Sequence, residues 1–152
     1  MSLFSSLNIS GSGLSAERLR MDVIANNIAN ANTTKGVDGQ PYQRQEVVFE
    51  PRVKPTLFLL PFDSKSQASS LDSRIGDGVR VAGVVSDPTP GKLVYDPGNP
   101  EADASGYVHM PNVNIVNEMV DMLSASRAYE ANVTAINATK GMAEKALAIG
   151  QA

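Results

Sequence analysis

The sequence predicts a mainly α-helical fold with a small β-rich insert, in which the two ends of the chain form long helices that pair as a coiled coil. Two observations lead to this prediction. Near each end of the chain, apolar residues recur at alternating steps of four and three residues, as they do along one side of an amphipathic helix. Between the ends, short β-branched runs alternate with Gly- and Pro-rich turns, a pattern typical of hairpins.

The last quarter of the chain, residues 112–149, predicts one long helix. Pro111 followed by Asn112 or Asn114 is a start signal, and Gly150 is a stop signal. At about 1.5 Å per residue this helix is about 55 Å long, too long for one small core. Two lines of residues spaced seven apart form a seam that is predicted to meet another long helix: Ile115, Met122, Tyr129, Ile136 and Ala143 on one, and Met119, Ser126, Val133, Lys140 and Leu147 on the other.

Residues 2–35 predict a second long helix. Its main apolar line carries Leu7, Leu14, Met21 and Ile28, with Ile24 beside it, and a weaker stripe carries Ile9, Ala16, Leu19 and Val23. A helix that is apolar on two faces needs more than one neighbour. Its glycines and asparagines lower the intrinsic helix propensity. We therefore expect this segment to be disordered in the free monomer and helical in an assembly.

The middle of the chain predicts short strands and turns. Strands are expected at 43–49, 78–85, 92–95 and 106–110, because β-branched and aromatic residues gather there between turn clusters. The predicted organisation is a coiled-coil domain of the two terminal helices, residues 1–36 and 111–152, and a β-rich middle domain at 37–110 with a flexible loop at about 52–77. The apolar block at 57–62 in that loop is either a core strand of the insert or a partner-binding patch.

Composition excludes several classes of function. With 13 basic and 16 acidic residues the net charge is -3, which argues against a nucleic-acid partner. Cysteine is absent, and no run of residues is long and apolar enough for membrane insertion or for a secretory signal peptide. If the protein leaves the cytoplasm, it is therefore expected to do so by a route other than a cleaved secretory signal.

No catalytic, cofactor or metal site is predicted, and no small-molecule substrate is expected. Residues 11–16 match the dinucleotide fingerprint G-x-G-x-x-A, but no strand precedes them and no β-α-β unit follows. We interpret these small residues as allowing close helix approach. His109 is the sole histidine and lacks partners for a metal or a nucleophile, so a structural position in a strand near the helix junction is preferred.

The Asn-rich run at residues 26–32 is unexpected inside a helix. Its amides could hydrogen-bond across a subunit interface and fix its register, or they could belong to a fraying, solvated helix end. Because Asn lowers helix stability, the interface is the preferred interpretation for Asn26, Asn27 and Asn30.

The motifs in both predicted helices resemble those of a known family. Residues 10–16 (SGSGLSA) and 21–33 (MDVIANNIANANT) resemble the amino-terminal motif of bacterial flagellar rod and hook proteins. Residues 92–100 (KLVYDPGNP), 110–114 (MPNVN) and 124–132 (SASRAYEAN) resemble the proximal-rod members of that family. The resemblance covers about residues 1–50 and 79–150. The stretch 52–77 is longer than the family pattern.

The resemblance implies a structural protein of the flagellar basal body rather than an enzyme. It implies terminal helices packed as the coiled-coil inner domain of a hollow helical tube that transmits torque and continues the export channel. The implied partners are copies of the chain, other rod proteins and the flagellar type III export apparatus, with an extracytoplasmic or periplasmic location after export. A soluble helical adaptor of the export system, its two helices closed as a hairpin, is the alternative.

The predicted assembly interface follows the seams and the Asn-rich run: Leu7, Leu14, Met21, Ile24, Asn26, Asn27, Ile28, Asn30, Ile115, Met119, Met122, Tyr129, Val133, Ile136 and Leu147.

Overall fold

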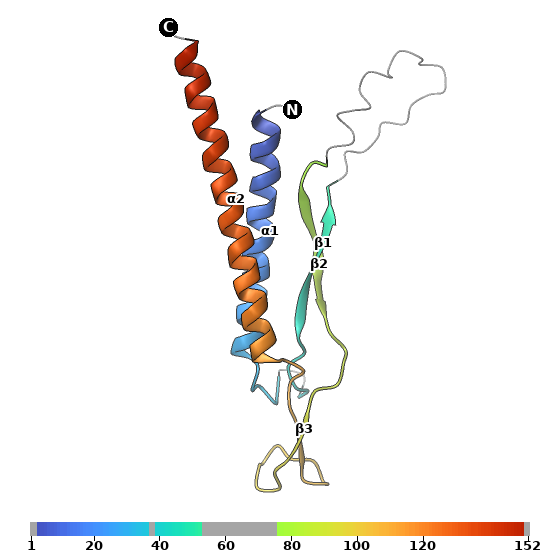
Figure 1. The fold of residues 1–152 in the computed structure, drawn as a ribbon. Coiled ribbons are helices and arrows are strands. Elements are labelled where there is room, and N and C mark those ends of the chain that lie inside the picture. Colours follow the sequence, from blue (N-terminus) through green and yellow to red (C-terminus); the bar gives the residue numbers. More distant parts are fainter. Residues whose placement is uncertain (1–2, 37–38, 53–75, 151–152) are drawn as a thin grey trace, which may run out of the picture.

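The computed structural model describes residues 3–36, 39–52 and 76–150 as two long helices and two antiparallel hairpins. The elements follow in the order α1 (Leu3–Ala29), β1 (Gln45–Pro51), β2 (Val79–Ser86), β3 (Leu93–Tyr95), β4 (Tyr107–His109) and α2 (Ile115–Ile149). Helix α1 contacts α2 and also both strands of the β1–β2 hairpin, so its two apolar faces have two neighbours. In Figure 1 the chain ends lie at one end of the molecule and β3 lies at the other. The predicted mainly helical fold with small β elements is confirmed.

Both helices are shorter than predicted, for local reasons. Asn114 caps α2 with extended backbone, and its side chain accepts hydrogen bonds from the amides of Val116 and Asn117, so the helix begins at Ile115 rather than at 112. Gly150 ends α2, as predicted. Helix α1 ends at Ala29 and not at 35. Asn30 donates its side-chain amide to the backbone and side-chain oxygens of Asn26 (3.0 and 2.8 Å), and such bonds compete with helix continuation.

The strands lie within two residues of their predicted bounds. Strands β1 and β2 pair with a register shift between Val48 and Phe49, which marks a bulge. Strand β1 extends to Pro51, which lies opposite Val79. A proline is tolerated at the end of a strand, where the ladder does not require a hydrogen bond from its nitrogen. Strand β3 pairs with β4. Most of the loop predicted at 52–77, including the apolar block at 57–62, lies outside the described residues.

The buried core of the described residues is small and partly polar. Its apolar members are Ala16, Val23, Ile24, Ala31, Val47, Val108 and Ala125. The largest side chains that are fully buried are polar, Glu118 and Asn27. A core of this kind supplies little hydrophobic stabilisation per residue. Burial of charge and amide must therefore be compensated by hydrogen bonds.

The β2 end of the hairpin approaches α1 closely at Ser12. The Ser12 hydroxyl donates to the Ile9 carbonyl (2.7 Å) and accepts from the Val79 amide (3.1 Å). Gly78 has a φ of +101° and lies so close to Ser12 that a Cβ would overlap the hydroxyl. Only glycine satisfies both conditions.

Among the described helices, none combines the length and the apolar character that crossing a bilayer requires.

Candidate assembly interface

A group of hydrogen-bonded side chains, which we call the polar node, joins α1, α2 and the segments between them. It consists of Asn27, Tyr42, Arg44, Gln45, Asn112 and Glu118. At its centre Asn27 is fully buried. Its amide nitrogen donates to the Gln45 carbonyl (2.8 Å) and to Glu118 Oε2 (3.0 Å). Its amide oxygen accepts from the Tyr42 hydroxyl (2.8 Å) and the Gln45 amide (3.0 Å). The whole hydrogen-bonding capacity of Asn27 is therefore used within one chain.

The charge of Glu118 is compensated by Arg44. Arg44 Nε donates to Glu118 Oε1 at 2.6 Å, and the carboxylate is 1% exposed. This hydrogen bond raises the pKa of Arg44, against the opposing effect of burial. Burial, reinforced by the Glu118 charge, raises the pKa of Tyr42. Arg44 and Glu118 therefore stabilise each other in the node, because either charge without the other would be poorly solvated.

Weaker ion pairs extend the node along the helices. Arg44 lies 3.5 Å from Asp121, and Arg20 of α1 lies 3.7 Å from the other oxygen of the same carboxylate. Since these groups are about a third exposed, solvent screens their attraction. These ion pairs help to fix the register of α1 against α2 and contribute less to the stability of the fold.

Asn112 connects the node to the loop after β2. Its side-chain oxygen accepts from the Arg44 amide (2.7 Å), and its nitrogen donates to the Asp87 carbonyl (3.1 Å) and to the Thr89 hydroxyl (3.1 Å). Hydrogen bonds from Thr89 lower the pKa of Asp87. One amide thereby fixes three segments at the point where the chain turns into α2.

Away from the node, small and polar side chains mediate the contact between α1 and α2. The seven-residue line Glu118, Ala125, Asn132 and Thr139 contains the buried residues of α2, together with Asn132, whose side chain lies within 3 Å of where a Gly13 Cβ would be. The expected close approach at the small residues of α1 is therefore present at Gly13. Gly11, by contrast, has open space around it.

The predicted interface residues lie at different depths. Ile24 and Asn27 are buried within the chain. Asn26, Ile115, Met119 and Leu147 are exposed. The remainder are half-buried: Leu7, Leu14, Met21, Ile28, Asn30, Met122, Tyr129, Val133 and Ile136. Hydrogen bonds within the chain account for the buried Asn27, whereas the exposed Met119 and Leu147 have no cover from α1.

An apolar surface on the first turns of α2, which we call the outer stripe, includes two predicted seam residues, Ile115 and Met119, and extends beyond them to residues that the seams did not contain. It comprises Ile115 (42% exposed), Val116 (68%), Met119 (61%), Val120 (63%) and Leu123 (60%). At 100° per residue, Val116, Val120 and Leu123 point away from the side that carries Glu118 and Ala125. Their spacing of four and three residues was the available signal. The stripe ends at Arg127, beyond which this side of the helix becomes polar.

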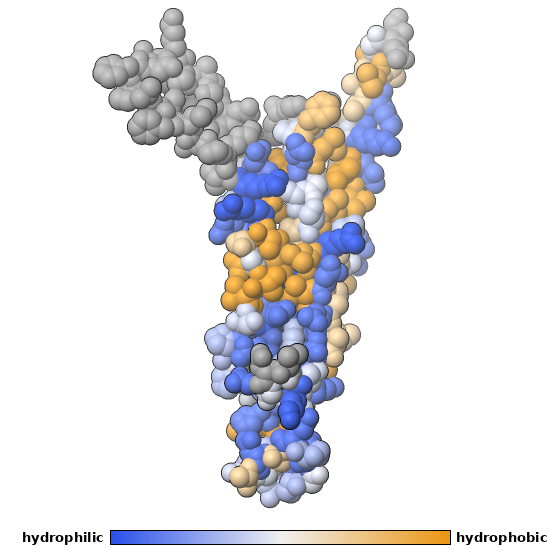
Figure 2. Space-filling model, turned by 180° about the vertical axis from the view of Figure 1, so that it is seen from behind, coloured by the Kyte–Doolittle hydropathy of each residue, from blue (hydrophilic) through white to orange (hydrophobic). Residues whose placement is uncertain are grey.

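Apolar side chains also reach the surface elsewhere. Viewed from behind, they form a band across the middle of the molecule and continue up one helix (Figure 2). On the β1–β2 hairpin, Val48, Val84 and Val85 are between 41% and 55% exposed. Exposed apolar surface of this extent is characteristic of a protein that assembles with others.

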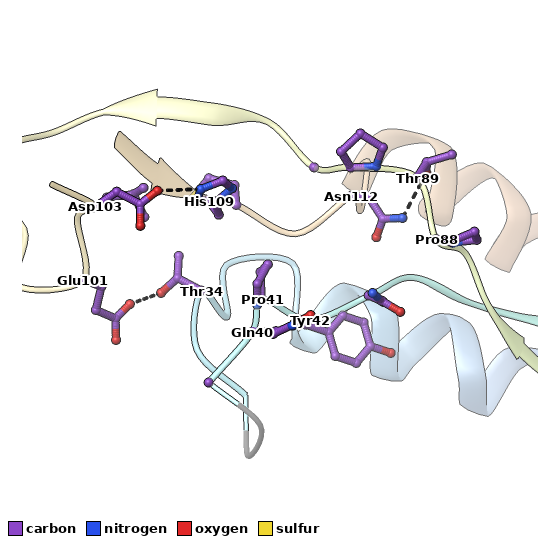
Figure 3. Close-up of a pocket in the computed structure, with 16 residues that line it drawn as sticks. Thr34, Gln40, Pro41, Tyr42, Pro88, Thr89, Glu101, Asp103, His109 and Asn112 are labelled. Atoms are coloured by element: carbon purple, nitrogen blue, oxygen red, sulfur yellow. Dashed lines mark hydrogen bonds and ion pairs between the residues drawn. The ribbon is translucent and has the colours of Figure 1, made fainter. Parts of the chain in front are cut away.

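A polar cleft near the helix junction has a volume of about 400 Å³. Figure 3 shows its lining: Thr34 faces Glu101, with which it is hydrogen-bonded, and His109 faces Asp103 (2.7 Å). His109 lies in β4, so the preferred strand position is confirmed. Within 3–36, 39–52 and 76–150, no three His, Cys, Asp or Glu side chains converge as a metal site would require. The cleft is therefore a junction of loops held by paired polar groups.

The family of the chain follows from its similarity to known proteins. Residues 7–36 match the family described as flagella basal body rod protein, and residues 104–149 match the flagellar basal body rod FlgEFG protein C-terminal family. The flagellar basal-body rod protein FlgC of Borreliella burgdorferi is 54% identical over 155 residues, covering 99% of both chains. The chain belongs to the FlgC family of flagellar basal-body rod proteins.

Relatives from distant bacteria agree with this assignment. The FlgC proteins of Bacillus subtilis and Salmonella typhimurium are 47% and 45% identical to the chain, and each alignment covers 99% of this chain and 100% of the relative. The chain is accordingly a structural subunit of the bacterial flagellar basal-body rod. The alternative of a soluble adaptor receives no support from these relatives.

Proposed function

We propose that the chain is a subunit of the proximal rod that assembles with copies of itself and with other rod proteins into a hollow helical drive shaft. The observation that carries this proposal is the division of side chains on α2. Toward α1, the helix presents small and polar residues such as Ala125 and Asn132. The outer stripe on the opposite side of its first turns leaves apolar side chains about 60% exposed, and these need a partner outside the chain.

In this assembly residues 1–36 and 111–152 form the inner domain, and residues 37–110 face outward. The helices pair as a coiled coil that neighbouring subunits complete on further sides. Burying a large apolar side chain is worth about 1.5–3 kcal/mol, and ordering a residue's backbone costs about 1–2 kcal/mol. Contacts with several subunits are therefore needed to order the ends of the helices. A heterologous interface that does not close then generates a helix of subunits.

The remaining features of the proposed function concern transport and location. The subunit passes through the flagellar type III export apparatus and reaches its place outside the cytoplasmic membrane. There the assembled tube transmits torque and continues the export channel. The role is structural and non-catalytic. Within this proposal the predicted seam residues Leu7, Leu14, Met21, Ile28, Met122, Tyr129, Val133 and Ile136 line the contacts between helices, within and between subunits.

The proposal is tested in a flagellated bacterium from which the resident relative has been deleted. The chain, expressed in that strain, should be recovered in isolated basal bodies and should restore the rod seen by electron cryomicroscopy. Val120→Asp places a charge in the outer stripe and should be missing from basal bodies while its urea unfolding midpoint is unchanged. Asn137→Asp, which adds a charge to the exposed polar part of the same helix, is the matched control. Recovery of the wild-type chain in the cytosol alone, beside a normal rod, would instead favour an export adaptor.

A further inference from the structure

Helix α2 extends beyond α1 at the end of the molecule that carries the chain termini. Gly13 lies against Asn132, and Asn27 is hydrogen-bonded to Glu118. The two helices are therefore antiparallel, and the same number of residues separates the two contacts in each helix. Continuing this register places Leu3 opposite Met142. Residues 143–149, which we call the overhang, therefore lie beyond the start of α1, over a length of about 10 Å at the rise of an α-helix. Figure 1 shows that α2 extends further than α1 at this end.

The overhang continues the side of α2 that faces α1. Ala146 is the next member of the seven-residue line that runs through Glu118, Ala125, Asn132 and Thr139. Met142 and Ile149 flank Ala146 on the same side of the helix, and they are 58% and 80% exposed. A helix face that is occupied by α1 for most of its length thus ends in two turns that have no partner among the described residues.

The outer stripe matches this face in pattern and in length. Met142, Ala146 and Ile149 are spaced by four and then three residues, as are Val116, Val120 and Leu123. Helices whose apolar residues follow this spacing interdigitate when they pack. The exposed apolar residues of the hairpins, such as Val85 and Leu93, lie on strands and do not present this spacing.

We propose that the overhang of one copy packs on the outer stripe of a second copy. The inference rests on the proposed rod function and specifies one of its contacts. The two surfaces differ, and Val120 and Ala146 lie about 40 Å apart along α2. Each copy therefore offers one overhang and one stripe at opposite ends, and the contact propagates head to tail instead of closing into a dimer.

The absence of cysteine from the chain permits a direct test. Two full-length variants are prepared, Ala146→Cys and Val120→Cys, and their helicity is checked by circular dichroism. A disulfide requires Cα atoms within about 7 Å, so these positions cannot be bridged within one chain. Oxidation of the mixture should give a disulfide-linked pair containing one of each variant, identified by mass spectrometry. Each variant alone should give about tenfold less dimer. A chain carrying both substitutions should give a ladder of oligomers.

Two further variants define the specificity of the contact. Ser105→Cys, in the exposed turn before β4, is the control and should pair with Ala146→Cys no better than background. Ile149→Asp, introduced beside Ala146→Cys, changes a side chain that is 80% exposed, so the fold is preserved and the cross-link should fall about tenfold.

The proposal is overturned if Ala146→Cys couples mainly to itself, or if the mixed pair forms no faster than the Ser105→Cys control at the highest soluble concentration. A chain that fails this cross-linking test but is still recovered in basal bodies would overturn the self-contact alone and leave the rod function intact.

Discussion

At the scale of single residues, the hydrogen-bonding capacity of side chains decides which positions are buried. Asn27 lowers the intrinsic stability of α1, yet it makes four hydrogen bonds to groups from three segments. Glu118 is buried because Arg44 and Asn27 both reach it. These polar contacts define one arrangement of the chain, since a shift along either helix would leave several buried groups without partners.

Removal of the central amide should strongly destabilise the fold. Asn27→Ala leaves the Tyr42 hydroxyl, the Gln45 backbone groups and Glu118 short of partners, and unsatisfied buried groups cost about 1–3 kcal/mol each. We expect the free energy of urea unfolding to fall by about 2–5 kcal/mol. Asn8→Ala, at an exposed position of the same helix, should change it by less than about 1 kcal/mol. Equal effects of the two substitutions would contradict the role of the node.

Tyr42 makes stability depend on alkaline pH. Its pKa is raised above the ordinary value of 10.0, so above about pH 10 the unfolded chain loses this proton before the folded chain does. The folded state then binds more protons, and the free energy of unfolding falls as pH rises. Tyr42→Phe should be less stable near pH 8, by about 1 kcal/mol for the lost hydrogen bond. Its stability should then decline less steeply above pH 10, as measured by denaturant titrations at each pH. Parallel declines in the two proteins would exclude this linkage.

At the scale of the elements, the positions at which helices, strands and loops approach closely determine their packing more than hydrophobicity does. Helix α1 lies near α2 at Gly13 and near β2 at Ser12. The loop before β3 crosses the segment before α2 at Gly91, where a Cβ would overlap the Met110 carbonyl oxygen. Small residues at these crossings allow the elements to approach closely. Larger residues would separate them.

The two glycines of α1 should respond in opposite ways to substitution. Gly11→Ala meets nothing within 4 Å and should raise stability by about 0.5–1 kcal/mol, because alanine is the better helix former. Gly13→Leu would push against the Asn132 side chain and separate α1 from α2, with an expected loss of about 1–3 kcal/mol. Thermal unfolding of both variants checks the pair. A stabilising Gly13→Leu would show that the helices do not meet there.

At the scale of the whole molecule, burial is graded from the node toward the chain ends. Buried residues of α2 occur at Glu118, Ala125 and Thr139, and the final ten residues contain none. At the same end, Phe4 of α1 is 76% exposed and Ile149 of α2 is 80% exposed. The single subunit is thus best packed around the polar node and least packed where other subunits are proposed to join it.

Hydrogen exchange of the dilute chain should reproduce this gradient. Helix propensity alone led to an expectation of disorder at residues 2–35 in the free monomer, whereas the contacts of α1 predict slow exchange of the amides of residues 16–31 and 115–132. Amides of residues 140–149 should exchange at nearly the rate of an unfolded peptide, because local opening there exposes little apolar surface. Protection at 140–149 should rise when the chain is assembled. Uniform protection along α2 in the dilute monomer would contradict both the gradient and the need for assembly.

Periodic and turn-forming residues were sufficient to predict the two helices, the hairpins and the stop at Gly150, because these depend on neighbours close in the chain. They left the start of α2 open between Asn112 and Asn114, and the structure places the cap at Asn114. The family motifs likewise lie in continuous stretches. The node could not be predicted, since Asn27, Arg44, Asn112 and Glu118 are distant in sequence and isolated polar residues carry no periodic signal.

Only the tertiary structure decided which side of α2 faces α1. Apolar spacing placed Ile115 and Met119 on the seam, but the buried line runs through Glu118 and Ala125. The hydrogen bonds that Glu118 accepts and the close approach of Gly13 to Asn132 hold this side of α2 against α1, because a buried carboxylate without partners would be strongly destabilising. The amino-acid order thus determined the elements and their lengths to within a few residues, while three-dimensional contacts determined which apolar surface remained available to other subunits.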